Sequence, residues 1–168
     1  MVRIVRPTII DVEASGFGPG GYPIEIGLAL SDGARFSCLI LPLPEWEFWD
    51  PEAEKVHHLS RDILNRHGKP AAAVAAKLNM LLEERTVYSD GWVVDKPWVD
   101  LLYYAAGVRL RYTVSPLERI LTEPQMALWH HTQQQVIGEL NLQRHRASTD
   151  AMIIQETYQR TLAACSAE

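Results

Sequence analysis

The sequence lacks several features that define specialised classes of protein. Its two cysteines, Cys38 and Cys165, lie far apart and form neither a CxxC pair nor a zinc-ligand spacing. No apolar run approaches the ~20 residues that a membrane-spanning helix needs, and the first ten residues contain no apolar secretion-signal core. We therefore expect reduced thiols, no membrane contact and a cytoplasmic location.

The sequence also contains fewer positively than negatively charged residues. Lys and Arg number 16 against 21 Asp and Glu, which gives a formal net charge of −5. No overall positive field attracts nucleic acid or an anionic membrane, so a bound polyanion must be held by local cations, metal ions or backbone dipoles. Binding to a nucleic acid should therefore engage few phosphates and depend only weakly on salt.

What is present is typical of a globular domain. The chain has 168 residues, of which 47% are apolar and 22% charged, and this composition excludes a disordered or fibrous protein. There is no repeat, low-complexity tract or linker. We therefore predict a single domain over residues 1–168 that buries one hydrophobic core.

The order of predicted elements indicates an α/β fold. Three strands near the start of the chain form a meander, and several helices come next. Two further strands follow, and after each of them the chain forms one or more helices. The strands are predicted at 8–11, 24–30, 35–40, 85–89 and 108–114. Five helices are predicted to begin at residues 51, 61, 70, 96 and 146, the second of them capped by Ser60. Two more are predicted at the capping-box patterns 115–118 and 122–125. This order predicts a mixed five-stranded sheet flanked by helices, as in the ribonuclease H-like fold.

Two acids, Asp11 and Glu13, follow the apolar run of the first strand. Residues i and i+2 of a strand project from the same face, so both carboxylates can point at one spot. Paired carboxylate oxygens suit Mg²⁺ or Mn²⁺. The alternative is a solvated strand end, which needs no ion.

A histidine and an aspartate lie close to the start of the last predicted helix. His145 and Asp150 are five residues apart, and on a continuous helix this spacing leaves their side chains ~140° apart. They can face one cleft only if the helix begins just after His145. A surface or capping histidine is the alternative.

Two further aspartates follow the fourth strand. Asp90 precedes Gly91 and fits a turn, while Asp95 lies two residues before Pro97 and fits a helix N-cap. Either can instead supply a third carboxylate to the pair on the first strand.

Taken together, these motifs resemble the DEDDh family of 3′-5′ exonucleases. The likeness rests on "DVEASG", "PIEIGLAL", "KVHHLSRDIL" and "HRASTDA", with "VVD" aligned to the middle motif, which selects Asp95 over Asp90. Ala14 and Val94 depart from the usual family residues, which bears on substrate fit.

The resemblance implies a two-metal hydrolysis of phosphodiester bonds at 3′ ends of single-stranded DNA or RNA, releasing nucleoside 5′-monophosphates. Two Mg²⁺ or Mn²⁺ ions would be bridged by Asp11, and His145 would act as general base. The implied metal ligands are Asp11, Glu13, Asp95 and Asp150.

Residues of the loop after the first strand are the candidate substrate contacts: Ala14, Ser15, Gly16 and Phe17. Phe17 would stack on a base or, alternatively, pack into the core. His57 and His58 would line the cleft mouth or serve in capping and packing, and Arg144 and Arg146 would meet phosphate.

The rival hypothesis is a non-catalytic ribonuclease H-like module that binds a polymerase or another nucleic-acid enzyme. The sequence leaves open DNA versus RNA, a homodimer and a polymerase partner.

Overall fold

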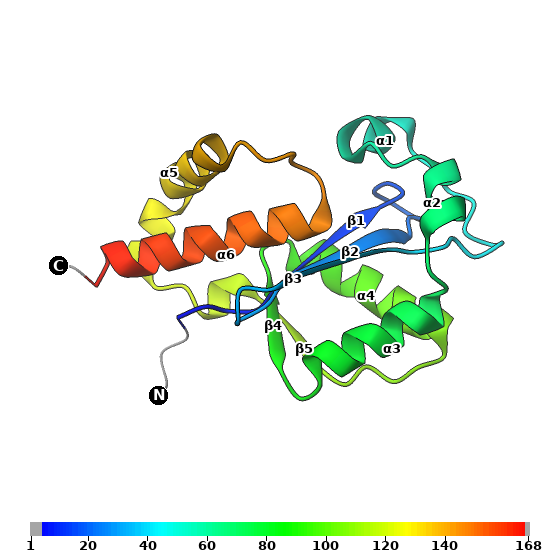
Figure 1. Ribbon diagram of the computed structural model, residues 1–168, viewed down its shortest axis with the longest axis horizontal. Helices are drawn as coiled ribbons and strands as arrows, with labels where there is room; N and C mark the ends of the chain where they lie inside the picture. The colour runs from blue at the N-terminus through cyan, green and yellow to red at the C-terminus, as the bar shows by residue number, and fades with distance from the viewer. Residues whose placement is uncertain (1–4, 167–168) are drawn as a thin grey trace.

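The computed structural model describes residues 5–166 and places a mixed five-stranded sheet between two groups of helices (Figure 1). The strand order is β3-β2-β1-β4-β5, with β1, β2 and β3 antiparallel and β4 and β5 parallel to β1. The strands are β1 (Ile9–Ala14), β2 (Pro23–Ala29), β3 (Arg35–Leu39), β4 (Thr86–Ser89) and β5 (Thr113–Pro116). The α-helices are α1 (Pro51–His57), α2 (Arg61–His67), α3 (Ala71–Leu82), α4 (Trp92–Ala106), α5 (Glu123–Leu140) and α6 (Ala147–Ala164). The predicted ribonuclease H-like fold is confirmed.

Alternation along β1 divides its side chains between two cores. Ile10 and Val12 pack with residues of α3 and α4 on one face of the sheet, whereas Ile9 packs with residues of α6 on the other. Asp11 and Glu13 share the parity of Ile9, so they project toward α6. Helix α6 therefore covers the face on which the two acids lie.

The beginning of α6 lies directly on β2 at Gly27. A Cβ atom added to Gly27 would lie 2.0 Å from the carbonyl carbon of Ala147, so only glycine permits this approach. Gly27 pairs with Asp11 across the sheet. The close contact thus brings the start of α6 next to the acids of β1.

Several predicted boundaries were wrong. Strand β1 continues through Ala14, so the two acids lie inside the strand, beside an irregularity in its pairing with β2, rather than beyond its end. Helix α4 begins at Trp92, before Pro97, because the amides of Val94 and Asp95 both bond the carbonyl of Gly91 and close its first turn.

The fifth strand is shorter than predicted because a side chain of α3 binds the backbone that precedes it. Asn79 Nδ2 donates to the carbonyl of Arg109, and Asn79 Oδ1 accepts from the amide of Arg111. The predicted capping box at 115–118 is also wrong, since Ser115 and Pro116 belong to β5 and a short 3₁₀ turn follows.

The capping box at 122–125 is present, with Thr122 and Gln125 bonding each other's backbone at the start of α5. Helix α6 begins at Ala147, which leaves His145 on the preceding loop as predicted. Within residues 5–166, no helix combines the length and the apolar character that crossing a bilayer requires.

Candidate active site

Three predicted acids from the two ends of the chain meet above the sheet. Asp11 and Glu13 come from β1 and Asp150 from the first turn of α6, and one oxygen of each lies within 4.8 Å of the others. The three carboxylates form one cluster because β1 directs Asp11 and Glu13 toward α6 and because Gly27 allows the start of α6 to lie close to the sheet.

Asp95 lies in the first turn of α4 and is 3% exposed. Its Oδ2 accepts a hydrogen bond of 2.5 Å from Ser89 Oγ at the end of β4. Asp95 is outside the group of three, yet its charge is the largest electrostatic contribution that raises the pKa of Asp11. Asp90 is exposed and borders a hollow beside Leu117 and Trp129, and its charge makes a smaller contribution to the raised pKa of Asp11. The placement favours Asp95 as the fourth acid of the cluster.

The acids of the cluster are held close enough to oppose one another's ionisation. Burial, followed by the charges of Asp95, Glu13 and Asp150, raises the pKa of Asp11 well above its usual value. Burial and the charge of Asp150 raise the pKa of Glu13 to about 8, and burial raises the pKa of Asp95 to about 7. A cluster of this kind is stable as a set of charged groups only when cations neutralise it.

The donor set fits a divalent metal ion. All candidate ligands are carboxylates, which are the hard oxygen donors that Mg²⁺ and Mn²⁺ favour. One oxygen of each of three side chains is already within reach of a common point. The raised pKa values mean that metal binding would displace protons from the acids.

His145 lies on the loop immediately before α6. Its backbone is left-handed, with φ 61°, and its amide donates to Asp150 Oδ2 at 3.0 Å. Arg144 Nε donates to the other oxygen, Asp150 Oδ1, at 2.9 Å. The loop and the acid are thereby bound to each other, and the exposed imidazole lines a cavity beside the cluster.

The cavity has a volume of about 420 Å³ and is enclosed largely by apolar side chains. Its lining includes Glu13, Ala14, Gly16, Phe17, His57, Trp98 and His145. Phe17 is 72% exposed and its ring centroid lies 5.7 Å from that of Trp98, so Phe17 does not pack into the core. A flat aromatic group of a ligand can enter here within reach of both Glu13 and His145.

Ser15 differs from the other predicted substrate contacts. It is fully buried, its Oγ accepts from the amide of Tyr22, and its own amide donates to the carbonyl of Tyr22. Its polar groups are thus used to close the glycine-rich loop. His57 lines the cavity, whereas His58 forms the C-cap of α1.

The arginines next to His145 are occupied within the protein. Arg144 binds Asp150, as described above, and Arg146 forms a two-pronged ion pair with Glu25 of β2. Both arginines were expected to meet phosphate, and their present partners are carboxylates instead.

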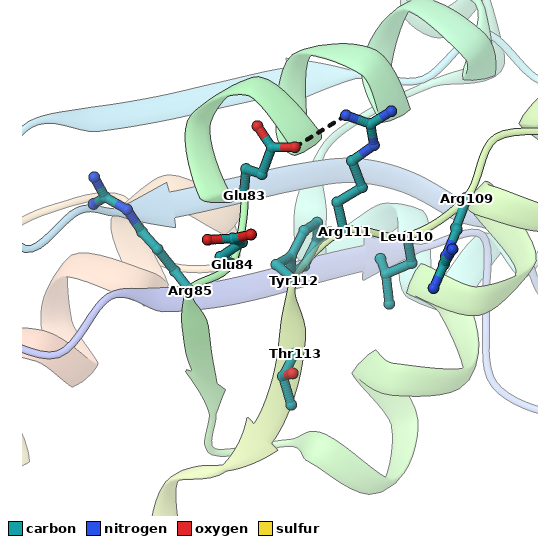
Figure 2. A pocket seen from close by; sticks show the side chains of 8 residues that line it. All are labelled: Glu83, Glu84, Arg85, Arg109, Leu110, Arg111, Tyr112 and Thr113. Atoms are coloured by element: carbon teal, nitrogen blue, oxygen red, sulfur yellow. Dashed lines mark hydrogen bonds and ion pairs between the residues drawn. The ribbon is translucent and has the colours of Figure 1, made fainter.

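A further hollow, of about 550 Å³, lies at the ends of β4 and β5 opposite to the acid cluster (Figure 2). Three arginines line it, together with Glu83 and Glu84, and Arg111 forms an ion pair of 2.9 Å with Glu83. Two acids thus offset much of the positive charge, and these arginines lie at the far end of the strands from the carboxylates.

No protein-family model matches the chain, and no curated protein matches it in sequence. Solved structures do match. Zinc-bound E. coli exonuclease I in complex with single-stranded DNA superposes with a TM-score of 0.69 over 95% of this chain, at 11% identity. The fold is that of exonuclease I.

Two further exonuclease I structures support this assignment of the fold. Another structure of exonuclease I matches 96% of the chain with a TM-score of 0.67 and 11% identity. The enzyme from Methylocaldum szegediense matches 72% of the chain with a TM-score of 0.56 and 12% identity. The chain spans 41%, 44% and 28% of these three exonuclease I chains, respectively.

Sequence reasoning missed three residues that shape the site. Ser89 binds Asp95, Trp98 forms a wall of the cavity, and Glu25 binds the loop that carries His145. A buried acid in the middle of an otherwise apolar strand, "PIEIGLA", was the available signal for Glu25, because such a group requires a partner.

Proposed function

We propose that this chain is a metal-dependent 3′-5′ exonuclease that hydrolyses single-stranded DNA or RNA and releases nucleoside 5′-monophosphates. The observation that carries the proposal is the cluster of Asp11, Glu13 and Asp150 with His145 beside it, at the edge of a cavity able to take a base. The exonuclease I fold supports it, although the chain spans less than half of those enzymes.

The proposed metal ligands are Asp11, Glu13, Asp95 and Asp150, for two Mg²⁺ or Mn²⁺ ions. When bound, such ions supply electrostatic stabilisation to the attacking and leaving oxygens of a phosphodiester. Four carboxylates and two dications are nearly neutral together, which removes the repulsion that raises the pKa values of Asp11 and Glu13.

The remaining roles belong to side chains at the cavity. His145 would accept the proton of the attacking water, because an imidazole can act as a general base and this one is exposed and lines the cavity. Phe17 would stack on the terminal base, with Trp98 behind it and the backbone of Ala14 and Gly16 beside the sugar. Ser15 would hold the loop in shape.

The decisive experiment uses 3′-labelled single-stranded DNA and RNA oligonucleotides with Mg²⁺ or Mn²⁺. The parent chain should release labelled mononucleotide, Asp11→Ala should abolish the release, and His145→Ala should reduce it to a low residual rate. Glu47→Gln, which alters an exposed glutamate outside the cluster, is the control and should retain full activity. Binding of Mn²⁺ should be lost in Asp11→Ala and kept in His145→Ala.

Two outcomes would contradict the proposal. Undiminished activity in Asp11→Ala would remove the metal centre from the reaction. Oligonucleotide binding by a parent chain that cuts neither DNA nor RNA would favour the non-catalytic binding module.

A further inference from the structure

A buried ion pair fixes the residue that follows His145. Glu25 of β2 is 1% exposed, and Arg146 reaches it with Nη2 at 2.9 Å from Oε1 and Nε at 3.1 Å from Oε2. The amide of Ala147, the first residue of α6, donates to Oε2 at 3.2 Å. Glu25 therefore provides the cap that α6 does not obtain from its own N-cap residue, Arg146.

These contacts separate Glu25 from the acid cluster beside it. Glu25 is paired with Glu13 in the β1–β2 register, and its charge contributes to the raised pKa of Glu13. Both of its oxygens are nevertheless occupied by Arg146 and Ala147. A carboxylate this deeply buried is stable only with such partners, and Glu25 lies outside the group of three acids, so we assign its charge to holding the loop.

His145 needs support from its surroundings. A left-handed backbone is unfavourable for a residue with a side chain, and His145 has φ 61°. The conformation is maintained by contacts on both sides: Asp150 binds the amide of His145 and the side chain of Arg144, and Glu25 binds Arg146. The Glu25–Arg146 contact anchors the loop to the sheet, whereas the Asp150 contacts join it only to its own helix.

We propose that Glu25 and Arg146 are positioning residues that hold the His145 imidazole at the cavity in the geometry needed for proton transfer. This inference rests on the proposed nuclease function. Neither residue touches the substrate; both act through His145. Loss of the bidentate contact between Arg146 and Glu25 should let the backbone of His145 leave its left-handed conformation. The imidazole would then move, while the carboxylates of β1 stay in place.

The test makes three variants of the pair, each in the parent and in a His145→Ala background. Arg146→Lys keeps the positive charge and loses the bidentate contact of the guanidinium. Glu25→Gln keeps the shape of the side chain and loses its negative charge. The double variant Glu25→Met with Arg146→Met leaves no unpaired buried charge, so it keeps the fold testable if a single variant is unstable. Arg160→Lys is the matched control, because Arg160 lies in α6, which Arg146 precedes, and likewise binds carboxylates, those of Glu139 and Glu156.

In the parent background, each of the three variants should lower kcat by about 10- to 100-fold, since small displacements of a reacting group have effects of this size. KM and Mn²⁺ affinity should change by less than about twofold, and Arg160→Lys should match the parent. In a His145→Ala background the same substitutions should have no further effect on the residual rate, because residues that act as one unit are not additive.

Two results would overturn the inference: an unchanged kcat in all three variants, or an equal loss in both backgrounds. Backbone hydrogen exchange provides a readout that does not depend on activity. Residues 144–147 should exchange faster in the three variants than in the parent or in Arg160→Lys, and unchanged exchange would refute the positioning role. If the parent proves inactive, the proposed function fails while exchange still decides whether the pair orders this loop.

Discussion

The charge of Glu13 should destabilise the metal-free protein, and Glu13→Gln should therefore stabilise it. Burial and the neighbouring acids raise the pKa of Glu13 from 4.5 to about 8 in the folded chain. The folded protein thus keeps a proton that the unfolded chain releases. Stability from this group is fully present below about pH 4.5 and is lost as the pH rises toward 8.

The size of the effect follows from the shift, because each pKa unit corresponds to about 1.4 kcal/mol. The stability gained by Glu13→Gln over the parent should rise from about 1 kcal/mol at pH 5 to about 3 kcal/mol at pH 7, and level off near 5 kcal/mol above pH 8. Glutamine has nearly the shape of the protonated acid, so packing changes little.

Urea unfolding of chelator-treated protein at these three pH values measures the difference directly. Saturating Mn²⁺ should narrow the difference, because ligand at about 100 times its Kd adds about 2.7 kcal/mol to a protein that binds it and less to one that has lost a ligand. Glu47→Gln is the control and should follow the parent at every pH. A stability difference that does not vary with pH would refute the view that Glu13 lies among unneutralised like charges.

Three further substitutions address other parts of the molecule. Asp95→Asn should lower nuclease activity by about 10²-fold or more while Asp90→Asn should change it only a few-fold; the opposite ranking would assign the third carboxylate to Asp90. Phe17→Ala should raise KM for single-stranded oligonucleotides by about 5- to 150-fold, the equivalent of stacking worth ~1–3 kcal/mol, whereas Tyr104→Ala, which removes an exposed aromatic from α4, should have no effect. Gly27→Ala should lower the free energy of unfolding by about 3 kcal/mol, because its Cβ would overlap the backbone of Ala147, while Gly138→Ala in α5, where a Cβ meets nothing within 4 Å, should raise it by up to about 1 kcal/mol; equal effects in urea unfolding would contradict the close approach of α6.

Elements set by short-range signals could be predicted from the sequence. The β1–β3 meander has alternating or continuous apolar strands and a glycine turn, and the caps at Ser60 and Thr122 bond the residues three positions later. The fifth strand was predicted but its bounds were wrong, because the backbone at 109 and 111 is bound by Asn79 of α3, which is distant in sequence. Residues 108–114 read VRLRYTV, and this alternation of apolar and polar side chains is typical of a strand.

The same distinction applies to the site. Asp11, Glu13 and Asp150 were indicated by spacing and order along the chain, and the structure brings them together. The roles of Ser15 and Glu25 depend on contacts with Tyr22 and Arg146, and no local pattern encodes these partners. A motif thus identifies the groups able to do chemistry, whereas the contacts that hold them require the three-dimensional structure.

The acid cluster joins the first strand of the chain to its last helix, and this has a consequence for biosynthesis. A ribosome has made β1, with Asp11 and Glu13, long before it makes α6, with Asp150. Until α6 has been made and packs on Gly27, the cluster lacks Asp150, and His145 is not yet in place beside it. The proposed metal centre therefore cannot form before α6 is made, and a fragment that stops short of α6 lacks part of it.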